Sequence, residues 1–227
     1  MSKKQGKRYR QWLEKAPKDP VPLADAVSAL LAMTGCKFDQ TIEMSVHLGI
    51  DPRQADQAIR GSISLPHGIG QSRKVIAFCE GDDIEKAKGA GAIEAGADEL
   101  IQKVTDGWMD FDVAISTPKM MRSVSRLGRV LGPQGKMPSP KTGTVVDDIA
   151  KAVAEYSAGK VEYRNDDGGN LHVPIGKMSF DAQKLVENAE AILSHIKRIK
   201  PSTSKGTYLK KICLSGSMTP GVQVVTA

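Results

Sequence analysis

Lys37-Phe38-Asp39-Gln40-Thr41-Ile42-Glu43-Met44-Ser45-Val46-His47-Leu48 is the stretch on which the fold of this chain depends. From Ile42 onward, apolar and polar residues alternate strictly. This pattern predicts a β-strand over 41–48, because successive strand side chains point to opposite faces of a sheet. We expect the apolar residues to pack on a core. The other face carries Thr41, Glu43, Ser45 and His47, and it is either solvated or in contact with a ligand.

Positive charge is concentrated in the two ends of the sequence. The 227 residues carry a formal net charge of +6. Residues 1–68 contain 10 Lys or Arg and 7 Asp or Glu, residues 69–158 contain 12 and 13, and residues 159–227 contain 10 and 6. If the two ends fold together, they form a basic domain, which attracts polyanions. The alternative is that the charge serves solubility alone.

The composition excludes several classes of protein. Aromatic residues make up 4% of the chain, too few for the stacking surface of many RNA-binding domains. Cys36, Cys79 and Cys213 lack the spacing of a metal site or a redox pair, so we expect reduced thiols. The apolar-leaning run 26–36 is too short to span a bilayer, and the basic N-terminus lacks the apolar core of a signal peptide. We expect a soluble cytoplasmic protein with no membrane contact, no metal and no cofactor.

The first part of the chain mixes helices with short strands. We expect, in order, a basic arm over 2–18 that leads into a short helix around Trp12 and Leu13, a helix over 22–31, the strand 41–48, a helix over 51–60 and a strand over 62–65. Asp51 and Pro52 have the pattern of an N-cap followed by proline at the first helical position. Pro66-His67-Gly68-Ile69-Gly70 then has the composition of a linker.

The middle of the chain predicts an inserted α/β domain. Arg73–Cys79 contains a continuous apolar run, which is typical of a strand covered on both faces. We expect helices over 83–89, 98–103 and 147–156 and another opened by Thr117 and Pro118. They alternate with a turn and short strand over 91–95 and a strand over 111–116. Strands that alternate with helices predict a parallel sheet.

A second glycine-bearing crossing, Ala158-Gly159-Lys160, returns the chain to the first domain. We expect strands over 161–164 and 171–175 joined by a turn at 165–169, a helix over 181–198, and a hairpin of 207–215 with 222–225. No Asp or Glu follows Glu190, which suits a surface that binds polyanions. The predicted domains are therefore 1–68 with 159–227, and 69–158. Two connections favour hinge motion, and the predicted hinge residues are Pro66, Gly68, Gly70 and Gly159.

The glycine-rich segments do not match the phosphate loops of enzymes. Gly135-Lys136 lacks the rest of a Walker-type loop, since Val130 replaces its first glycine and Met137 its hydroxyl residue. Gly89-Ala90-Gly91 follows a helical pattern rather than a strand. The histidines show no paired metal spacing, and no nucleophile elbow occurs. We therefore expect no enzyme. The alternative is a nucleotide-dependent enzyme that uses the inserted domain, and only fold analogy supports it.

Several segments resemble one family. They are Lys37–Glu43, Leu48-Gly49-Ile50-Asp51-Pro52-Arg53-Gln54-Ala55-Asp56, Arg60-Gly61 with Leu65–Gly68, Gly107–Val113, Leu127-Gly128-Arg129-Val130-Leu131-Gly132-Pro133-Gln134-Gly135-Lys136-Met137-Pro138, Gly159–Arg164 and Pro174–Lys177. In this order, over about residues 20–227, they are similar to bacterial large-subunit ribosomal protein L one, the family of the mobile ribosomal RNA stalk.

The resemblance implies a fold and a function. It implies a two-domain α/β fold, with a terminal split β-α-β domain formed by both chain ends and an inserted Rossmann-like α/β domain. It implies a constituent of the large ribosomal subunit that binds the stalk of large-subunit rRNA and assists release of deacylated tRNA from the exit site. Many members also repress translation by binding their own mRNA. We expect a monomer when the protein is free.

The RNA contacts of the family would fall here on Lys37, Phe38, Thr41, Glu43, His47, Asp166, Ser217, Met218 and Thr219. Hydroxyls and a carboxylate suit contacts to 2′-OH groups, and Phe38 and Met218 suit sugar or base surfaces. The alternative makes Phe38 a core residue and Glu43 a solvated one.

Two residues depart from the pattern of the family. Thr219 replaces a usual glycine, which calls into question a positive φ there. Asp167 stands where Lys is commoner, which removes a possible phosphate contact. Both departures predict altered or weaker affinity rather than lost function.

Overall fold

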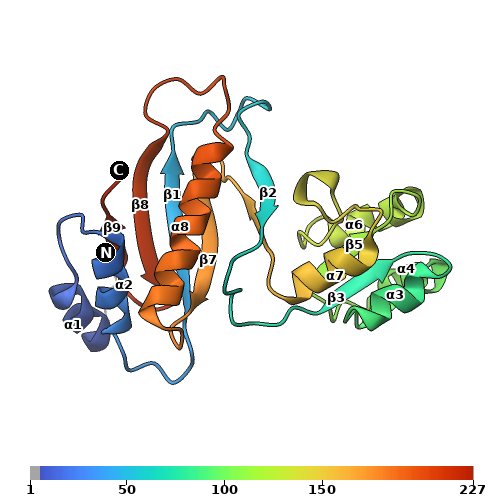
Figure 1. Cartoon of the computed structure of the whole chain (residues 1–227), viewed down its shortest axis with the longest axis horizontal. Coiled ribbons are helices and arrows are strands. Elements are labelled where there is room, and N and C mark those ends of the chain that lie inside the picture. The colour runs from blue at the N-terminus through green and yellow to red at the C-terminus, as the bar shows by residue number, and fades with distance from the viewer. Residues whose placement is uncertain (1–5, 227) are drawn as a thin grey trace. The chain divides into compact units, whose positions relative to one another are not determined.

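The computed structural model describes residues 6–226, and the chain divides into two compact units. The terminal unit comprises the chain up to Gly70 and from Tyr163 onward, and the inserted unit comprises Gln71–Glu162. Each unit contains helices and strands, which confirms the predicted two-domain α/β fold class (Figure 1). The start of the predicted basic arm, residues 2–5, lies outside the described residues; the short helix that follows it is α1 (Lys7–Lys15).

The terminal unit is built on a four-stranded antiparallel sheet with the strand order β7-β1-β8-β9. The strands are β1 (Thr41–Leu48), β7 (Asn170–Lys177), β8 (Leu209–Gly216) and β9 (Val222–Val224). The predicted strand, β1, lies between two strands from the C-terminal part of the chain. Neither chain end can complete this sheet alone, so the terminal unit is necessarily discontinuous.

Two helices pack on this sheet. Helix α2 (Leu23–Leu31) contacts β8, β9 and α8 (Ala182–Arg198), and α8 contacts β7 and lies in front of the sheet in Figure 1. Ile42, Met44 and Val46 of β1 are fully buried, whereas the four polar residues of the same strand are half-buried. The predicted alternation is therefore confirmed. Each buried apolar side chain stabilises the unit by about 1.5–3 kcal/mol.

The predicted helix over 51–60 is wrong, because these residues form successive turns. Asp51 does act as a local acceptor, since the Arg53 N–H donates to its Oδ1 at 3.1 Å. However, the Asp51 N–H donates to the side chain of buried Gln57 at 2.9 Å, and the Ile59 N–H donates to Asn165 Oδ1 at 2.8 Å. These side-chain acceptors compete with helical hydrogen bonds and hold Ile59 next to a strand.

That strand, β2 (Arg60–Ile63), begins two residues earlier than predicted and pairs with β6 (Val161–Arg164). The shift follows from the contact between Ile59 and Asn165, which sets where the pairing starts. Alternation within four residues is compatible with more than one register, so the sequence pattern did not decide it.

The inserted unit contains a parallel three-stranded sheet with the order β4-β3-β5, as the alternation of helices and strands predicted. The strands are β3 (Val75–Phe78), β4 (Glu94–Gly96) and β5 (Val113–Ser116). The helical segments are α3 (Asp83–Gly89), α4 (Asp98–Thr105), α5 (Met121–Val124), η1 (Ser125–Leu127), α6 (Gly128–Leu131), η2 (Pro140–Thr142) and α7 (Ile149–Ser157). Every residue of β3 and β5 is buried, as expected for strands covered on both faces.

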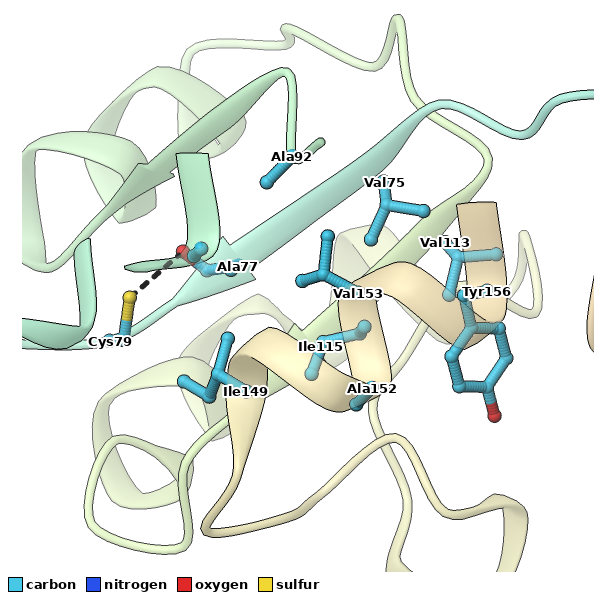
Figure 2. Packing of buried hydrophobic residues seen from close by; sticks show 11 residues of the cluster. Val75, Ala77, Cys79, Ala92, Val113, Ile115, Ile149, Ala152, Val153 and Tyr156 are labelled. Carbon is cyan, nitrogen blue, oxygen red and sulfur yellow. Dashed lines mark hydrogen bonds between the residues drawn. The ribbon is translucent and has the colours of Figure 1, made fainter. Parts of the chain in front are cut away.

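Two apolar clusters fill the spaces on either side of β3 and β5. One joins the sheet to α3 and α7 (Figure 2), and the other joins it to α4 and the α5–η1–α6 run. Tyr156 of α7 is fully buried in the first cluster, and its hydroxyl donates to Thr142 O at 2.6 Å. Burial raises the pKa of the Cys79 thiol in the same cluster to about 11, which keeps it protonated and unreactive. No described helix has both the length and the apolar character needed to cross a membrane.

Stability of the terminal unit is expected to fall as the pH drops below about 6.5, because His195 of α8 is held neutral. Arg198 Nη2 donates to His195 Nδ1 at 3.2 Å, so the proton of the neutral ring lies on Nε2 and is donated to the Tyr163 hydroxyl at 2.8 Å. Burial, and then the charge of Arg198, lower the pKa of His195 from 6.5. The unfolded chain therefore binds this proton first, and the stabilisation present above the unfolded pKa is lost on acidification.

The measurement is urea unfolding at pH 7.5 and pH 5.5 for the wild type and His195→Gln. Glutamine does not titrate, so the variant is expected to lose less stability between the two pH values. Equal losses in the two proteins would contradict the assignment.

Candidate nucleic-acid interface

The polar face of the terminal sheet is formed by side chains that the register brings side by side. Glu43 lies opposite Pro174 and Ser215, Ser45 lies opposite His172 and Cys213, and His47 lies opposite Asn170 and Lys211. We call this surface the open face. Eight strand residues extend over about 25 Å, so the open face is long enough to contact several nucleotides. A register shift between Ile42 and Glu43 marks one end of it.

Hydrogen bonds between neighbouring strands order the middle of the open face. His47 Nδ1 lies 2.7 Å from Asn170 Oδ1, and Ser45 Oγ lies 3.1 Å from His172 Nδ1. Glu43 Oε1 lies 3.4 Å from the same histidine nitrogen. Imidazole, hydroxyl and carboxylate groups are thus held in fixed positions, where they can donate to or accept from 2′-OH groups and base edges. Sequence reasoning missed the role of His172, because only the strand register reveals its partners.

Asp166 adjoins this network from the turn between β6 and β7. Its Oδ1 accepts from the Asn170 N–H at 2.7 Å and the Gly168 N–H at 2.9 Å, and its Oδ2 accepts from Asn170 Nδ2 at 2.9 Å. The hydrogen bonds from Asn170 hold the pKa of Asp166 below its ordinary value. The carboxylate therefore shapes the turn and remains an exposed acceptor. Asp167, its neighbour, is exposed as well.

The loop after β8 is bound to the start of β1. The Ser217 N–H donates to Thr41 O at 3.1 Å, and the Thr41 N–H donates to Ser217 Oγ at 3.2 Å. Lys177 Nζ donates to Thr41 Oγ1 at 2.8 Å, which places an ammonium group beside the hydroxyls. The structure thus brings Thr41 and Ser217 together, and it adds Lys177, which sequence reasoning did not select. Lys37 is exposed four residues before Thr41.

Two large apolar side chains are exposed near this end of the sheet. Phe38 is 51% exposed and Met218 is 50% exposed. The alternative in which Phe38 is a core residue is therefore wrong. Exposed apolar side chains beside fixed polar groups suit contact with the faces of sugars and bases. Their role in RNA binding stays a prediction.

Gln40 joins the segments that carry Phe38 and Met218, and sequence reasoning missed it. Its side chain is buried, with Oε1 accepting from the Met218 N–H at 2.9 Å and Nε2 lying 3.1 Å from Met178 Sδ. Asp39 also joins distant segments, because its carboxylate accepts hydrogen bonds from the Ser179 N–H and hydroxyl. Both residues belong to the segment Lys37–Glu43, but nothing in their spacing shows which distant groups they bind.

Gln40→Leu is expected to destabilise the terminal unit by about 1–3 kcal/mol, because the Met218 N–H loses its acceptor in a part-buried contact. The displaced loop should also weaken RNA binding by about tenfold. Urea unfolding and RNA titration measure the two effects. Gln102→Leu, on the exposed surface of α4, is the control and should change neither. Wild-type affinity in the Gln40 variant would contradict the role of the loop.

Thr219 differs from the other predicted contacts because it is buried. Its hydroxyl accepts from the Gly216 N–H at 2.7 Å and closes the turn of the loop. No non-glycine residue in the described part of the chain has a positive φ, so Thr219 does not require the backbone conformation of the glycine usual in the family. The structure thus assigns Thr219 to the shape of the loop rather than to its exposed surface.

The predicted hinge residues lie at the ends of the two units. Buried Asn188 of α8 accepts from the His67 N–H at 3.2 Å and donates to Gly68 O at 3.0 Å, which holds this segment to the terminal unit. Gly70 and Gly159 both have positive φ. Hinge motion at these positions stays a prediction.

The open face carries side chains that can bind nucleic acid. Among residues 6–226, no group of His, Cys, Asp or Glu side chains is arranged to hold a metal ion. The face offers fixed hydroxyls, imidazoles and carboxylates, with lysines at both ends and apolar side chains at one end.

Comparison with known proteins shows which family the chain matches. The family model described as "Ribosomal protein L1p/L10e family" matches residues 30–220. The curated protein "Large ribosomal subunit protein uL1" of Kosmotoga olearia is 51% identical over 200 residues, which cover 88% of this chain and 87% of that protein.

Proposed function

This chain belongs to the Ribosomal protein L1p/L10e family, and on that premise we propose that its open face binds the mobile stalk of large-subunit rRNA. Membership makes the chain a structural protein of the large ribosomal subunit in the cytoplasm and not an enzyme. The observation that carries the proposal is the open face itself, in which Phe38 and Met218 are exposed beside ordered polar groups.

The composition of the open face supports recognition of RNA shape more than of charge alone. Glu43 and Asp166 are carboxylates, and a surface that binds only phosphate would repel the RNA at such groups. A carboxylate can, however, accept hydrogen bonds from the 2′-OH and amino groups of RNA. Lys177 and Lys211 at opposite ends of the face supply phosphate contacts that fix the orientation of the RNA. We expect tight binding that depends only moderately on salt.

The test is a titration of the full chain with a stalk rRNA fragment and with a scrambled duplex of equal length, across a salt series. Tight binding of the fragment with a shallow salt slope supports the proposal, because each phosphate contact contributes roughly 0.7–0.9 to the log–log slope. Ligand at 100 times Kd should also raise the stability of the chain by about 2.7 kcal/mol. Equal, weak and steeply salt-dependent binding of both RNAs would overturn it.

We propose two finer roles. A face that recognises shape binds any RNA of that shape, so a matching structure in the protein's own mRNA would compete with rRNA and allow translational repression. The second role is contact with exit-site tRNA as the stalk moves, which rests on the two-unit construction of the chain. Competition between the mRNA leader and the stalk fragment tests the first role, and crosslinking to deacylated tRNA on ribosomes tests the second.

A further inference from the structure

The near-neutral charge of the inserted unit hides a strong internal separation. Its segment 113–146 contains six Lys or Arg and no Asp or Glu. The remainder of the unit, 71–112 with 147–162, contains seven Lys or Arg and fourteen Asp or Glu. One part of the unit is therefore strongly basic although the net charge of the whole unit is close to zero.

Ion pairs in this unit occur in the acidic part, where four of the seven Lys or Arg residues form one. In the acidic part, Lys74, Lys86, Lys103 and Lys160 each pair with a carboxylate. In the basic segment, five exposed side chains make neither an ion pair nor a side-chain hydrogen bond with any described residue. They are Lys119, Arg122, Arg126, Arg129 and Lys141. No direct ion pair within the unit therefore neutralises their positive charge.

Three of these residues form a stripe, which we call the arginine stripe. Arg122, Arg126 and Arg129 lie on the continuous helical run α5–η1–α6, at a spacing of four and three residues. That spacing places them on one side, opposite buried Val124, Leu127 and Leu131. Lys119 lies three residues before Arg122, in the turn that leads into α5.

The stripe has a cost to the helical run that no direct ion pair offsets. Like charges at a spacing of three or four residues destabilise a helix by about 0.2–0.5 kcal/mol per pair. All three residues are arginines, whose planar guanidinium groups bind two phosphate oxygens at once. The run from 122 to 129 rises by about 10 Å, which spans two or three successive phosphates of one strand.

We propose that the arginine stripe of the inserted unit is a second RNA-binding surface, which takes the phosphate backbone of a structured RNA. This surface is distinct from the open face, because its residues lie in the other unit and contact neither bases nor sugars. It contributes affinity and salt dependence without sequence preference.

The test compares the full wild-type chain with Arg122→Gln/Arg126→Gln/Arg129→Gln in binding to an RNA hairpin unrelated to the stalk. The matched control, Lys86→Gln/Lys88→Gln/Lys151→Gln, removes the same charge from α3 and α7, which pack on the other side of the sheet. All six positions are exposed, so the variants should fold like the wild type, as checked by thermal unfolding.

The arginine variant is expected to lose at least about tenfold in affinity at low salt and to lower the log–log salt slope by about 2, because roughly 0.7 is lost per phosphate contact. The control should change affinity less than about twofold. Substituting all three arginines by lysine should keep the slope and still reduce affinity severalfold.

If the arginine variant and the lysine control reduced RNA affinity equally, the proposal that the arginine stripe binds RNA would be overturned. Displacement of the hairpin by polyglutamate as readily as by unrelated RNA would overturn the assignment to RNA in favour of an acidic protein. Both results are independent of the open face, whose failure would appear instead as wild-type binding of the stalk fragment by variants of Phe38 and Met218.

Discussion

Replacing Phe38 and Met218 together by alanine is expected to weaken binding of the stalk rRNA fragment by about a hundredfold. A stacking contact of Phe38 is worth about 1–3 kcal/mol, and burial of the Met218 side chain against the RNA adds up to about 1.5–3 kcal/mol. Both side chains are half exposed beside the start of β1, so little stability should be lost with them. Neither carries charge. The slope of log affinity against log salt should therefore stay unchanged, which separates this effect from loss of phosphate contacts.

The control for this experiment is Leu13→Ala with Ile93→Ala. These side chains are 46% and 50% exposed and do not belong to the open face, so the control removes a comparable exposed apolar surface. It should bind the fragment as the wild type does. If the variant of Phe38 and Met218 binds equally well, the open face is not the rRNA site, although membership of the family would stand.

Gly49→Ala is expected to destabilise the terminal unit by about 3 kcal/mol, which is the upper range for forced overpacking. A Cβ at Gly49 would overlap the backbone carbonyl of Thr207. The Gly49 N–H donates to Tyr208 O at 2.7 Å, and the Ser204 hydroxyl donates to Gly49 O at 2.8 Å. The strand end and the 204–208 segment are thus held too close for any side chain, and backbone atoms cannot move aside as a flexible side chain would.

Urea unfolding measures this effect, with Gly6→Ala as the control. A Cβ at Gly6 would meet no atom within 4 Å, and its φ of −62° is open to any residue. The control should therefore change stability by less than about 0.5 kcal/mol. Equal stability of the two variants would show that the 204–208 segment moves freely away from Gly49.

The elements that local pattern predicts well are those with a strong period. Strand 41–48 and helix 181–198 were predicted almost to the residue, because apolar spacing decides which face is buried wherever the chain packs. The segment 51–60 failed for the opposite reason. Asp51 does accept a local hydrogen bond, as an N-cap residue would. However, the backbone N–H groups of Asp51 and Ile59 donate to the side chains of Gln57 and Asn165 instead of forming a helix.

The residues of the candidate site were likewise predictable from the sequence only in part. Its polar row on β1 follows from alternation, whereas the partners of that row do not. Glu43, Ser45 and His172 meet because β1 pairs with β7, more than a hundred residues later. Gln40 could not be selected, because its importance lies in a contact with Met218. Thr219 was selected because the contact loop of the family includes its position, yet its hydroxyl closes the loop.

The sequence by itself determined which residues of β1 face a core and that positive charge gathers at both chain ends. These properties depend on near neighbours along the chain, and side-chain direction alternates wherever a strand forms. Only the tertiary structure decided which strands flank β1 and how close Gly49 lies to Thr207. Those properties depend on contacts between residues far apart in sequence, which a local pattern does not encode.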